Sequence, residues 1–396
     1  MTASAEAPTS IRRPFTWLLV AKFCVNMALR LAYPFNTDIA RGLGVSLDSV
    51  GRVQGLGELT GLANIGIGRQ LDRGHTRRWI VVGVGMAGVG ALLLGAGSTL
   101  WVFGICSALV ACGTAIMTTS AQTWIGVRVP YAQRGRAIGL YEASWALSLL
   151  IGAPIAGYLI DRGSWWWPFL GIGALTIAVI PMLARSLVAH ETRPMEKPLR
   201  AGTPPPRIHW NRRVLAAVAT STLLTLGAVV VFASYGAWLK DRHGFSTASV
   251  SALTIGLGVV ELLGSGSTAA FADRLGKRRS VALGAVLMAL ASLVVVSSRS
   301  SALLASSGVV LLFGSFEFAY VSQLSINSEV GGSSRGRFMA INGAIVTVSR
   351  AVGAALGTWL YVNSGMATVA VLSFGCAVAA AAAITSTFER SAKLTA

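Results

Sequence analysis

Long apolar stretches alternate with short polar ones along nearly the whole chain. Each apolar stretch is about 20 residues long, the length that an α-helix needs to cross the hydrocarbon core of a bilayer. Helices are expected because a span in lipid must satisfy its backbone hydrogen bonds internally. The pattern predicts twelve spans, approximately Phe15–Phe35, Val50–Leu71, Trp79–Gly97, Leu100–Val127, Arg136–Ile160, a sixth that follows Trp165–Trp167, Val214–Lys240, Ser249–Ala272, Ser280–Ser297, Ala302–Asn327, Phe338–Val362 and Met366–Ser386.

A basic turn after the second span recurs after the eighth. The segments Asp72–Arg78 and Asp273–Arg279 both begin with Asp-Arg and end with Arg-Arg, and they lie 201 positions apart. The same shift superimposes Arg134–Arg136 on Arg335–Arg337, each of which reads Arg-Gly-Arg. A single shift that aligns separated motifs indicates two related halves, each a set of membrane helices.

Residues 188–213 interrupt this pattern. They are rich in charge, include Pro204–Pro206 and have no apolar face. Such a segment is typical of a semi-rigid spacer. We therefore expect an N-terminal six-helix bundle in residues 1–187, a cytoplasmic linker in residues 188–213 and a C-terminal six-helix bundle in residues 214–396.

Composition and charge support a membrane protein. The 396 residues are 54% hydrophobic and only 12% charged, with a mean hydropathy of +0.65. The net charge of +18 does not indicate nucleic-acid binding, because most of the 33 Lys and Arg residues lie in the N-tail, the even-numbered loops and the C-tail. By the positive-inside rule, this asymmetry predicts a multi-pass protein of the cell membrane with both termini in the cytoplasm.

The sequence carries no pattern for a metal, a cofactor or catalysis. The four cysteines lie in apolar stretches without metal-ligand spacing, and the predicted spans contain no histidine. No P-loop is present, which argues against export driven by ATP binding to this chain. We therefore expect a protein that is not an enzyme and that needs no metal or cofactor.

The turn Asp273–Arg279 resembles a motif of the major facilitator superfamily, Asp-Arg-x-Gly followed by two basic residues, which lies in a cytoplasmic loop of each half. The first copy departs from the motif at His75 and Thr76. The resemblance implies two pseudo-symmetric bundles around a central cavity, and a latch that closes the cytoplasmic side. The residues expected to gate or latch are Asp72, Arg73, Asp273, Arg274 and Arg350.

The predicted spans carry ionisable residues well inside them, among which we single out Arg30, Glu58, Glu142, Glu261, Glu317 and Arg350. Each costs roughly 2.5–3.5 kcal/mol at the bilayer centre, so we expect these groups to face one another or water. The third span of each triplet carries none, which matches the lipid-facing helices of the resembled family. The sequence thus predicts an all-α membrane protein of twelve helices around a central aqueous cleft.

Three of the glutamates are candidates for proton coupling, namely Glu317, Glu261 and Glu58. Glu317 is the strongest, since Phe316, Phe318 and Tyr320 surround it in sequence and an apolar environment favours the neutral carboxyl group. The alternative for each is a structural hydrogen bond or ion pair.

Arg30 keeps its charge at any relevant pH. It either binds an anionic group of a substrate or pairs with a carboxylate such as Glu58. Arg350 is expected to be structural, with Glu58 as its partner, because the second and eleventh helices pack together in the resembled family. Candidate substrate-binding residues, for which the alternative is a satisfied interhelical hydrogen bond, are Asn26, Arg30, Gln122, Tyr235, Glu317, Tyr320 and Gln323.

The fifth span contains Gly152, Pro154 and Gly157, which resemble the Gly-Pro-x-x-Gly motif in the antiporters of the same family. Here Ala153 separates Gly152 from Pro154. Proline kinks a membrane helix, and the small residues let neighbours approach closely. The motif favours antiport over symport.

These features predict a proton-coupled secondary transporter that exports a small organic or amphiphilic compound by alternating access. The alternative is a proton symporter or facilitator that imports a small polar or anionic solute. The expected partners are a small-molecule substrate, protons and membrane lipid, with no nucleic acid, and the expected state is a monomer.

Overall fold

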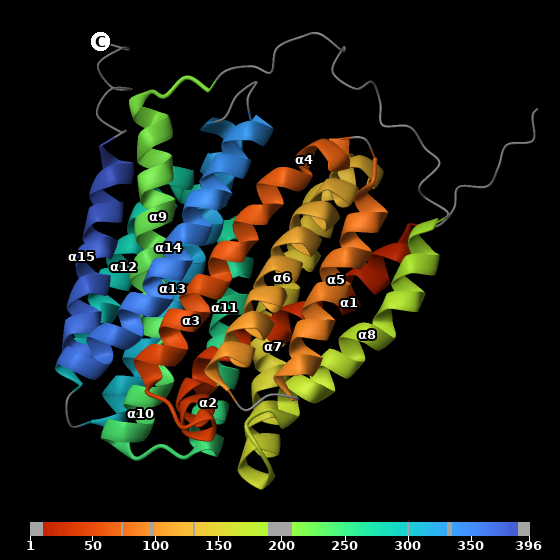
Figure 1. Cartoon of the computed structure of the whole chain (residues 1–396). Coiled ribbons are helices and arrows are strands. Elements are labelled where there is room, and N and C mark those ends of the chain that lie inside the picture. Colours follow the sequence, from red (N-terminus) through yellow and green to blue (C-terminus); the bar gives the residue numbers. More distant parts are fainter. Residues whose placement is uncertain are drawn as a thin grey trace, which may run out of the picture.

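The computed structural model describes residues 11–72, 74–95, 99–129, 131–188, 208–298, 301–330 and 335–386, and within them the regular structure is helical without strands. Two bundles lie side by side (Figure 1). The N-terminal bundle contains α1 (Arg12–Arg30), η1 (Tyr33–Phe35), α2 (Asn36–Leu43), α3 (Leu47–Leu59), η2 (Thr60–Ala63), α4 (Asn64–Asp72), α5 (Thr76–Leu94), α6 (Leu100–Arg128), α7 (Tyr131–Arg162) and α8 (Trp167–Val188). The C-terminal bundle contains α9 (Arg212–Phe232), α10 (Tyr235–His243), α11 (Thr247–Leu275), α12 (Lys277–Ser297), α13 (Ala302–Val330), α14 (Arg335–Ser364) and α15 (Met366–Thr385).

Eleven helical segments of the described residues are long and apolar enough to cross a membrane. The twelfth expected span is the interrupted helix α3–η2–α4. Its interruption has a local cause at Thr60, whose hydroxyl lies 2.6 Å from the Gly57 carbonyl oxygen and 2.8 Å from that of Ala108 on α6. A side chain that bonds its own preceding turn competes with the helical ladder and bends the helix. The fold is therefore an all-α membrane protein, as predicted.

The first helix of each bundle is followed by a short helix that the hydropathy pattern did not resolve. The stretch between the first two predicted spans is not a plain loop, because α2 occupies it and continues to Leu43. It ends where Gly44 adopts a left-handed conformation (φ 65°), and α10 ends in the same way at Gly244 (φ 68°). A glycine at this position caps a helix without steric strain. The end of the molecule at which these two helices lie is named the α2–α10 end (Figure 1).

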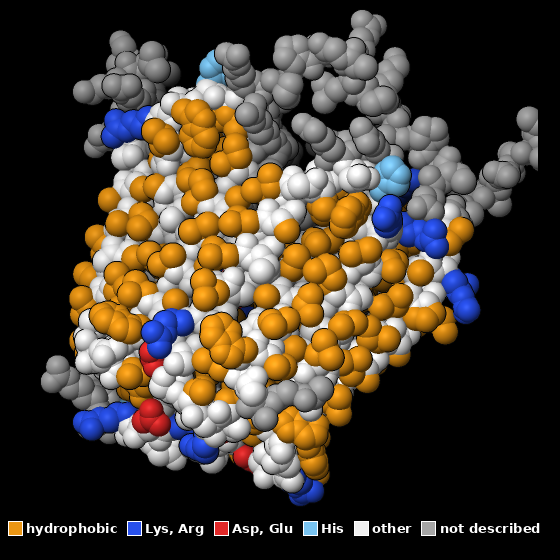
Figure 2. Space-filling model, in the orientation of Figure 1, with side chains coloured by type: hydrophobic (Ala, Val, Ile, Leu, Met, Phe, Trp, Pro, Cys, Tyr) orange, Lys and Arg blue, Asp and Glu red, His pale blue; other side chains and the backbone are white. Residues whose placement is uncertain are grey.

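Each bundle buries its own hydrophobic core and presents apolar side chains outward. Ile80, Met117 and Leu183 belong to a core of the N-terminal bundle, and Met288 and Val309 to that of the C-terminal bundle. Figure 2 shows apolar side chains over the middle of the visible face and charged ones toward its two ends. Helices α5, α8, α12 and α15 bear large exposed hydrophobic side chains, as expected for the lipid-facing third helix of each triplet.

The two bundles meet along two equivalent helix pairs, α3 with α14 and α7 with α11. Both contacts depend on glycine. A Cβ on Gly55 would lie 2.4 Å from the Ala351 carbonyl oxygen, and one on Gly258 would lie 2.8 Å from the Leu150 backbone nitrogen. Because each pair joins the second helix of one half to the fifth helix of the other, the contacts follow the two-fold relation that the repeat predicts.

These contacts extend from the α2–α10 end to the middle of the molecule. Farther along the same faces, a Cβ added at Gly139 on α7, Gly266 on α11 or Gly343 on α14 would have no other atom within 4 Å. The bundles, in the part of the chain that the structure describes, are thus packed together at the α2–α10 end and apart at the opposite end. That opposite end, where α8 finishes and α9 begins, is named the linker end.

Two sets of predictions lie outside the described residues. Arg73 is not described, and nothing is described of the side chains of Asp72, Asp273 and Arg274. The latch therefore stays a prediction. Residues 189–207, most of the expected linker, are also outside the described part, so the exact domain limits stay predictions as well.

Candidate functional site

An ion pair crosses the interface between Arg30 on α1 and Glu261 on α11. Arg30 Nη2 lies 2.6 Å from Glu261 Oε1, and the two side chains are only 6% and 1% exposed. The expectation that Arg30 pairs with a carboxylate such as Glu58 identified the kind of partner but not the residue. The reason is geometric: this part of α1 faces α7 and the C-terminal bundle, whereas Glu58 lies beside α14.

A second ion pair crosses the same interface in the opposite sense. Arg350 Nη2 on α14 lies 2.9 Å from Glu58 Oε1 on α3, the partner that the packing of these helices suggested. The Tyr33 hydroxyl donates a hydrogen bond of 3.2 Å to the same carboxylate oxygen. Each bundle therefore contributes one arginine and one glutamate to the two pairs.

Trp145 on α7 contacts the arginines of both pairs. Its ring centroid is 4.2 Å from the guanidinium carbon of Arg30 and 5.7 Å from that of Arg350. Its carbonyl oxygen accepts a hydrogen bond of 2.5 Å from Arg30 Nη1. Sequence reasoning missed this residue, because a tryptophan in an apolar span carries no signal that separates a contact with arginine from ordinary packing.

Glu317 on α13 has a neutral partner. Ser265 on α11 donates a hydrogen bond of 2.6 Å to Glu317 Oε1. The described residues place no cationic nitrogen within 4.0 Å of this carboxylate. Phe316 and Tyr320, its neighbours on the same helix, are stacked with ring centroids 5.3 Å apart. An acidic group with one hydroxyl donor and an aromatic wall is able to change its protonation state without breaking an ion pair.

Polar residues form a stripe along α1 at helical spacing, comprising Lys22, Asn26, Arg30 and Tyr33. Asn26 donates to the Ser144 hydroxyl at 3.2 Å. Lys22 is 3% exposed and donates to the Thr118 hydroxyl at 2.6 Å. Lys22 was absent from the predicted site, since a lysine within two turns of a helix end is usually read as reaching toward the headgroups.

Other predicted site residues are occupied by contacts within one bundle. Gln122 donates to Glu142 Oε1 at 3.0 Å, a contact that joins α6 to α7. Gln323 is buried and donates to the Ala217 carbonyl at 3.1 Å, and the Tyr235 hydroxyl lies 3.3 Å from that of Thr254. Their geometry fits the alternative of an interhelical hydrogen bond, although Gln323 Oε1 is buried without a partner.

The motif in α7 packs this helix between α1 and the other bundle. A Cβ on Gly152 would lie 3.0 Å from Met27 Cε, and one on Gly157 would lie 2.7 Å from the Ser251 side chain. Pro154 lies inside α7, one residue after Ala153, whose carbonyl accepts a 2.6 Å hydrogen bond from Ser251. The small residues thus permit close packing on two faces of α7.

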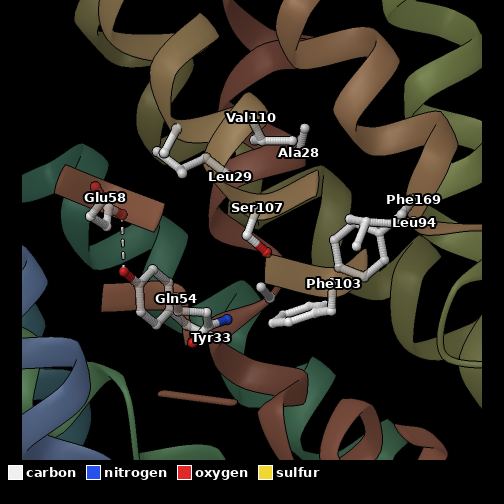
Figure 3. A pocket seen from close by; sticks show the side chains of 12 residues that line it. Ala28, Leu29, Tyr33, Gln54, Glu58, Leu94, Phe103, Ser107, Val110 and Phe169 are labelled. Atoms are coloured by element: carbon white, nitrogen blue, oxygen red, sulfur yellow. Dashed lines mark hydrogen bonds between the residues drawn. The ribbon is translucent and has the colours of Figure 1, made fainter. Parts of the chain in front are cut away.

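A cavity of ≈ 30 Å³ lies inside the N-terminal bundle next to the Glu58 pair. Figure 3 shows Tyr33, Gln54 and Glu58 on one side of it and the rings of Phe103 and Phe169 on the other. Gln54 Oε1 is buried without a hydrogen-bond partner. The volume is sufficient for about one water molecule.

A third ion pair joins the bundles at the α2–α10 end. Lys240 on α10 pairs with Asp38 on α2, and these side chains are 8% and 7% exposed. Lys240 also donates to the Thr247 hydroxyl at 2.8 Å. Nothing in the sequence pattern connects the two residues, because each lies in a short helix that hydropathy does not separate from its neighbouring span or loop.

The comparisons with known proteins agree with this architecture. Residues 18–314 match the sequence model of the Major Facilitator Superfamily. The uncharacterized MFS-type transporter YwfA of Bacillus subtilis (strain 168) is 25% identical over 295 residues, which cover 72% of this chain and 69% of the relative.

Two further relatives extend the comparison. The uncharacterized MFS-type transporter YceJ of the same bacterium is 24% identical over 265 residues, 65% of this chain and 66% of the relative. The aspyridones efflux protein of Neocamarosporium betae is 26% identical over 175 residues, 43% of this chain and 29% of the relative. With the family model covering most of the chain and two helical bundles meeting across buried ion pairs, the chain belongs to the Major Facilitator Superfamily of membrane transporters.

Proposed function

We propose that the chain is a proton-coupled secondary transporter that exports a small organic or amphiphilic compound. The two bundles rock about the interface of α3 with α14 and α7 with α11, which exposes a site at mid-depth alternately to each side. The linker end, with both termini, faces the cytoplasm. The transporter acts as a monomer.

The observation that carries the proposal is Glu317. It is a carboxyl group in the middle of α13, bonded to the neutral hydroxyl of Ser265, while Glu58 and Glu261 are held by arginines. Protonation of Glu317 therefore leaves the cross-bundle ion pairs intact. A bound proton favours one conformation only if the proton affinity of the carboxyl group differs between the conformations. Glu317 lies where α11 meets α13, so its proton affinity changes when the surroundings of these helices change.

Two observations support export. The small residues of α7 pack it closely against α1 and α11, as the resemblance to the antiporter motif implies. One relative is named as an efflux protein. The anion-importing alternative has less support, since Arg30 already pairs with Glu261.

The test uses everted membrane vesicles in which a pH gradient is reported by a fluorescent weak base. A panel of amphiphilic compounds is added, and those that dissipate the gradient are carried forward. We expect Glu317→Gln to abolish the response to these compounds while the protein keeps its melting temperature. Asp161→Asn, which removes an exposed carboxylate near the end of α7, is the control for the loss of one negative charge. Undiminished coupling in Glu317→Gln would exclude this carboxylate from the mechanism.

A further inference from the structure

The two cross-bundle ion pairs share one side chain, the indole of Trp145. The ring attracts both guanidinium groups through its quadrupole, and the shorter distance, 4.2 Å, is to Arg30. The backbone of the same residue accepts a hydrogen bond from Arg30. Trp145 belongs to the N-terminal bundle, as Arg30 does, whereas Arg350 belongs to the C-terminal bundle.

The arginines therefore differ in where their partners lie. Arg30 has two contacts within its own bundle, to the ring and to the carbonyl oxygen of Trp145, in addition to its ion pair with Glu261. Arg350 contacts Glu58 and Trp145, both on the opposite bundle. Among the described residues it has no hydrogen bond or ion pair to its own bundle, and its Nε is buried without a partner.

The carboxylates differ in the same way. Glu58 accepts a hydrogen bond from Tyr33 of its own bundle. Glu261 has Arg30 as its hydrogen-bonding partner among the described residues, and its Oε2 is buried without one. When the bundles separate at this level, Glu58 and Arg30 keep contacts that stabilise their charges. Glu261 loses its partner.

No replacement cation lies beside Glu261 in the described structure. The titratable and charged groups that face it are Arg30 on α1, Tyr235 on α10 and Glu317 on α13, and α7, which packs along α11, adds Glu142. Arg350 is on α14, which packs mainly against α3, α9 and α15, and none of its nitrogens lies within 4.0 Å of the Glu261 carboxylate. A carboxylate that loses its cation in largely apolar surroundings, before it is fully hydrated, is more stable when it is protonated.

We propose that Trp145 is a positioning residue that keeps the Arg30 guanidinium on the N-terminal bundle during separation, so that Glu261 takes up a proton from the solvent in that step. The inference rests on the proposed proton coupling, and it adds that Trp145 determines which carboxylate, Glu261 rather than Glu58, is protonated when the bundles separate. Without the indole, the Arg30 side chain is able to stay paired with Glu261 as the bundles separate. A proton then binds Glu261 only in competition with this ion pair.

The test follows bundle separation without a transported compound. Nitroxide labels are placed at Ser46→Cys and Ala248→Cys, two exposed positions on opposite bundles at the α2–α10 end. The distance distribution between the labels is measured by electron paramagnetic resonance on the full chain in lipid nanodiscs, from about pH 5 to about pH 9. We expect the separated fraction to rise as the pH falls.

Trp145→Leu is expected to weaken proton binding in the separated state roughly three- to tenfold, the range of one cation–π contact, which moves the transition lower by about half to one pH unit. Trp145→Phe keeps an aromatic ring, so it should lower the pH of the transition by a smaller amount. This variant keeps the test valid if the leucine variant misfolds. Trp101→Leu, at a tryptophan that is 80% exposed, is the matched control and leaves the transition in place. Glu261→Gln removes the part of the pH response that depends on Trp145, and Glu58→Gln retains it.

The outcomes are distinguishable. If the unchanged chain responds to pH while Trp145→Leu behaves like Trp101→Leu, the role of Trp145 is refuted and proton coupling stands. If Glu58→Gln removes the response and Glu261→Gln retains it, the selection of Glu261 is refuted. A chain with no response over the whole range refutes proton coupling itself.

Discussion

The buried ion pair of Asp38 with Lys240 makes a quantitative prediction about the α2–α10 end. The perturbations are Asp38→Asn and Lys240→Met, singly and together. Each single change removes one charge and leaves the other inside a site where both side chains are less than a tenth exposed. Breaking a buried pair in this way costs about 3–5 kcal/mol, because the remaining charge loses its compensation.

Part of this cost is offset locally. The Thr247 hydroxyl lies 2.8 Å from Lys240 Nζ and 3.4 Å from Asp38 Oδ1, so either remaining charge keeps one neutral partner, worth about 1–1.5 kcal/mol. Asp38 also keeps the exposed Arg41, whose Nη1 lies 3.7 Å from Asp38 Oδ1, so Lys240→Met is expected to cost less than Asp38→Asn. The expected loss for the closed arrangement is then roughly 2–3 kcal/mol, which is about a 30- to 150-fold increase in opening. The double variant buries no unpaired charge and recovers most of the loss.

The assay is the labelling of a cysteine by a membrane-impermeant maleimide at Thr358→Cys, a fully buried position on α14 that packs against Gly51 of α3. The four native cysteines are buried and are replaced to give a clean background. Each single variant should raise the labelling rate by the factor above, and the double variant should return it most of the way. Equal rates in all four proteins would refute the reasoning.

Two further predictions concern packing and buried polarity. Gly55→Ala places a Cβ 2.4 Å from the Ala351 carbonyl oxygen, so we expect it to reduce stability by about 1–3 kcal/mol in thermal unfolding, whereas Gly343→Ala, with open space around it, should leave the melting temperature within a degree or two. Gln323→Leu removes the amide that bonds Ala217 and Asn327, and the unsatisfied groups left behind should cost about 1–3 kcal/mol. Wild-type stability in Gly55→Ala would show that α3 and α14 separate easily, and wild-type stability in Gln323→Leu would assign that amide to a site facing water.

The sequence was sufficient for the helical architecture because hydropathy and the repeat act over the whole chain. It also identified Glu58 as the partner of Arg350, since both residues lie on helices whose packing the family fixes. Arg30 was harder, because a helix has several faces and periodicity within one span does not say which neighbouring helix each face meets. Its partner, Glu261, is 231 positions away.

The residues that were missed share a physical reason. Lys22 was overlooked because its position near a helix end is compatible with a solvated charge, and only the packing of Thr118 and Tyr141 around it shows burial. Asp38 lies in a helix too short to stand out from its flanking loop. In both cases the partner comes from another helix, and a single sequence contains no information on such pairs.

The exchange of one arginine and one glutamate between the bundles has an electrical consequence. The two pairs at mid-depth place Arg30 and Glu58 on one bundle and Glu261 and Arg350 on the other, so each bundle carries one positive and one negative charge at this level. Parting the bundles here therefore separates no net charge. These two pairs add little voltage sensitivity to the rocking motion, in contrast to the pair of Asp38 with Lys240, whose parting leaves opposite charges on the two bundles.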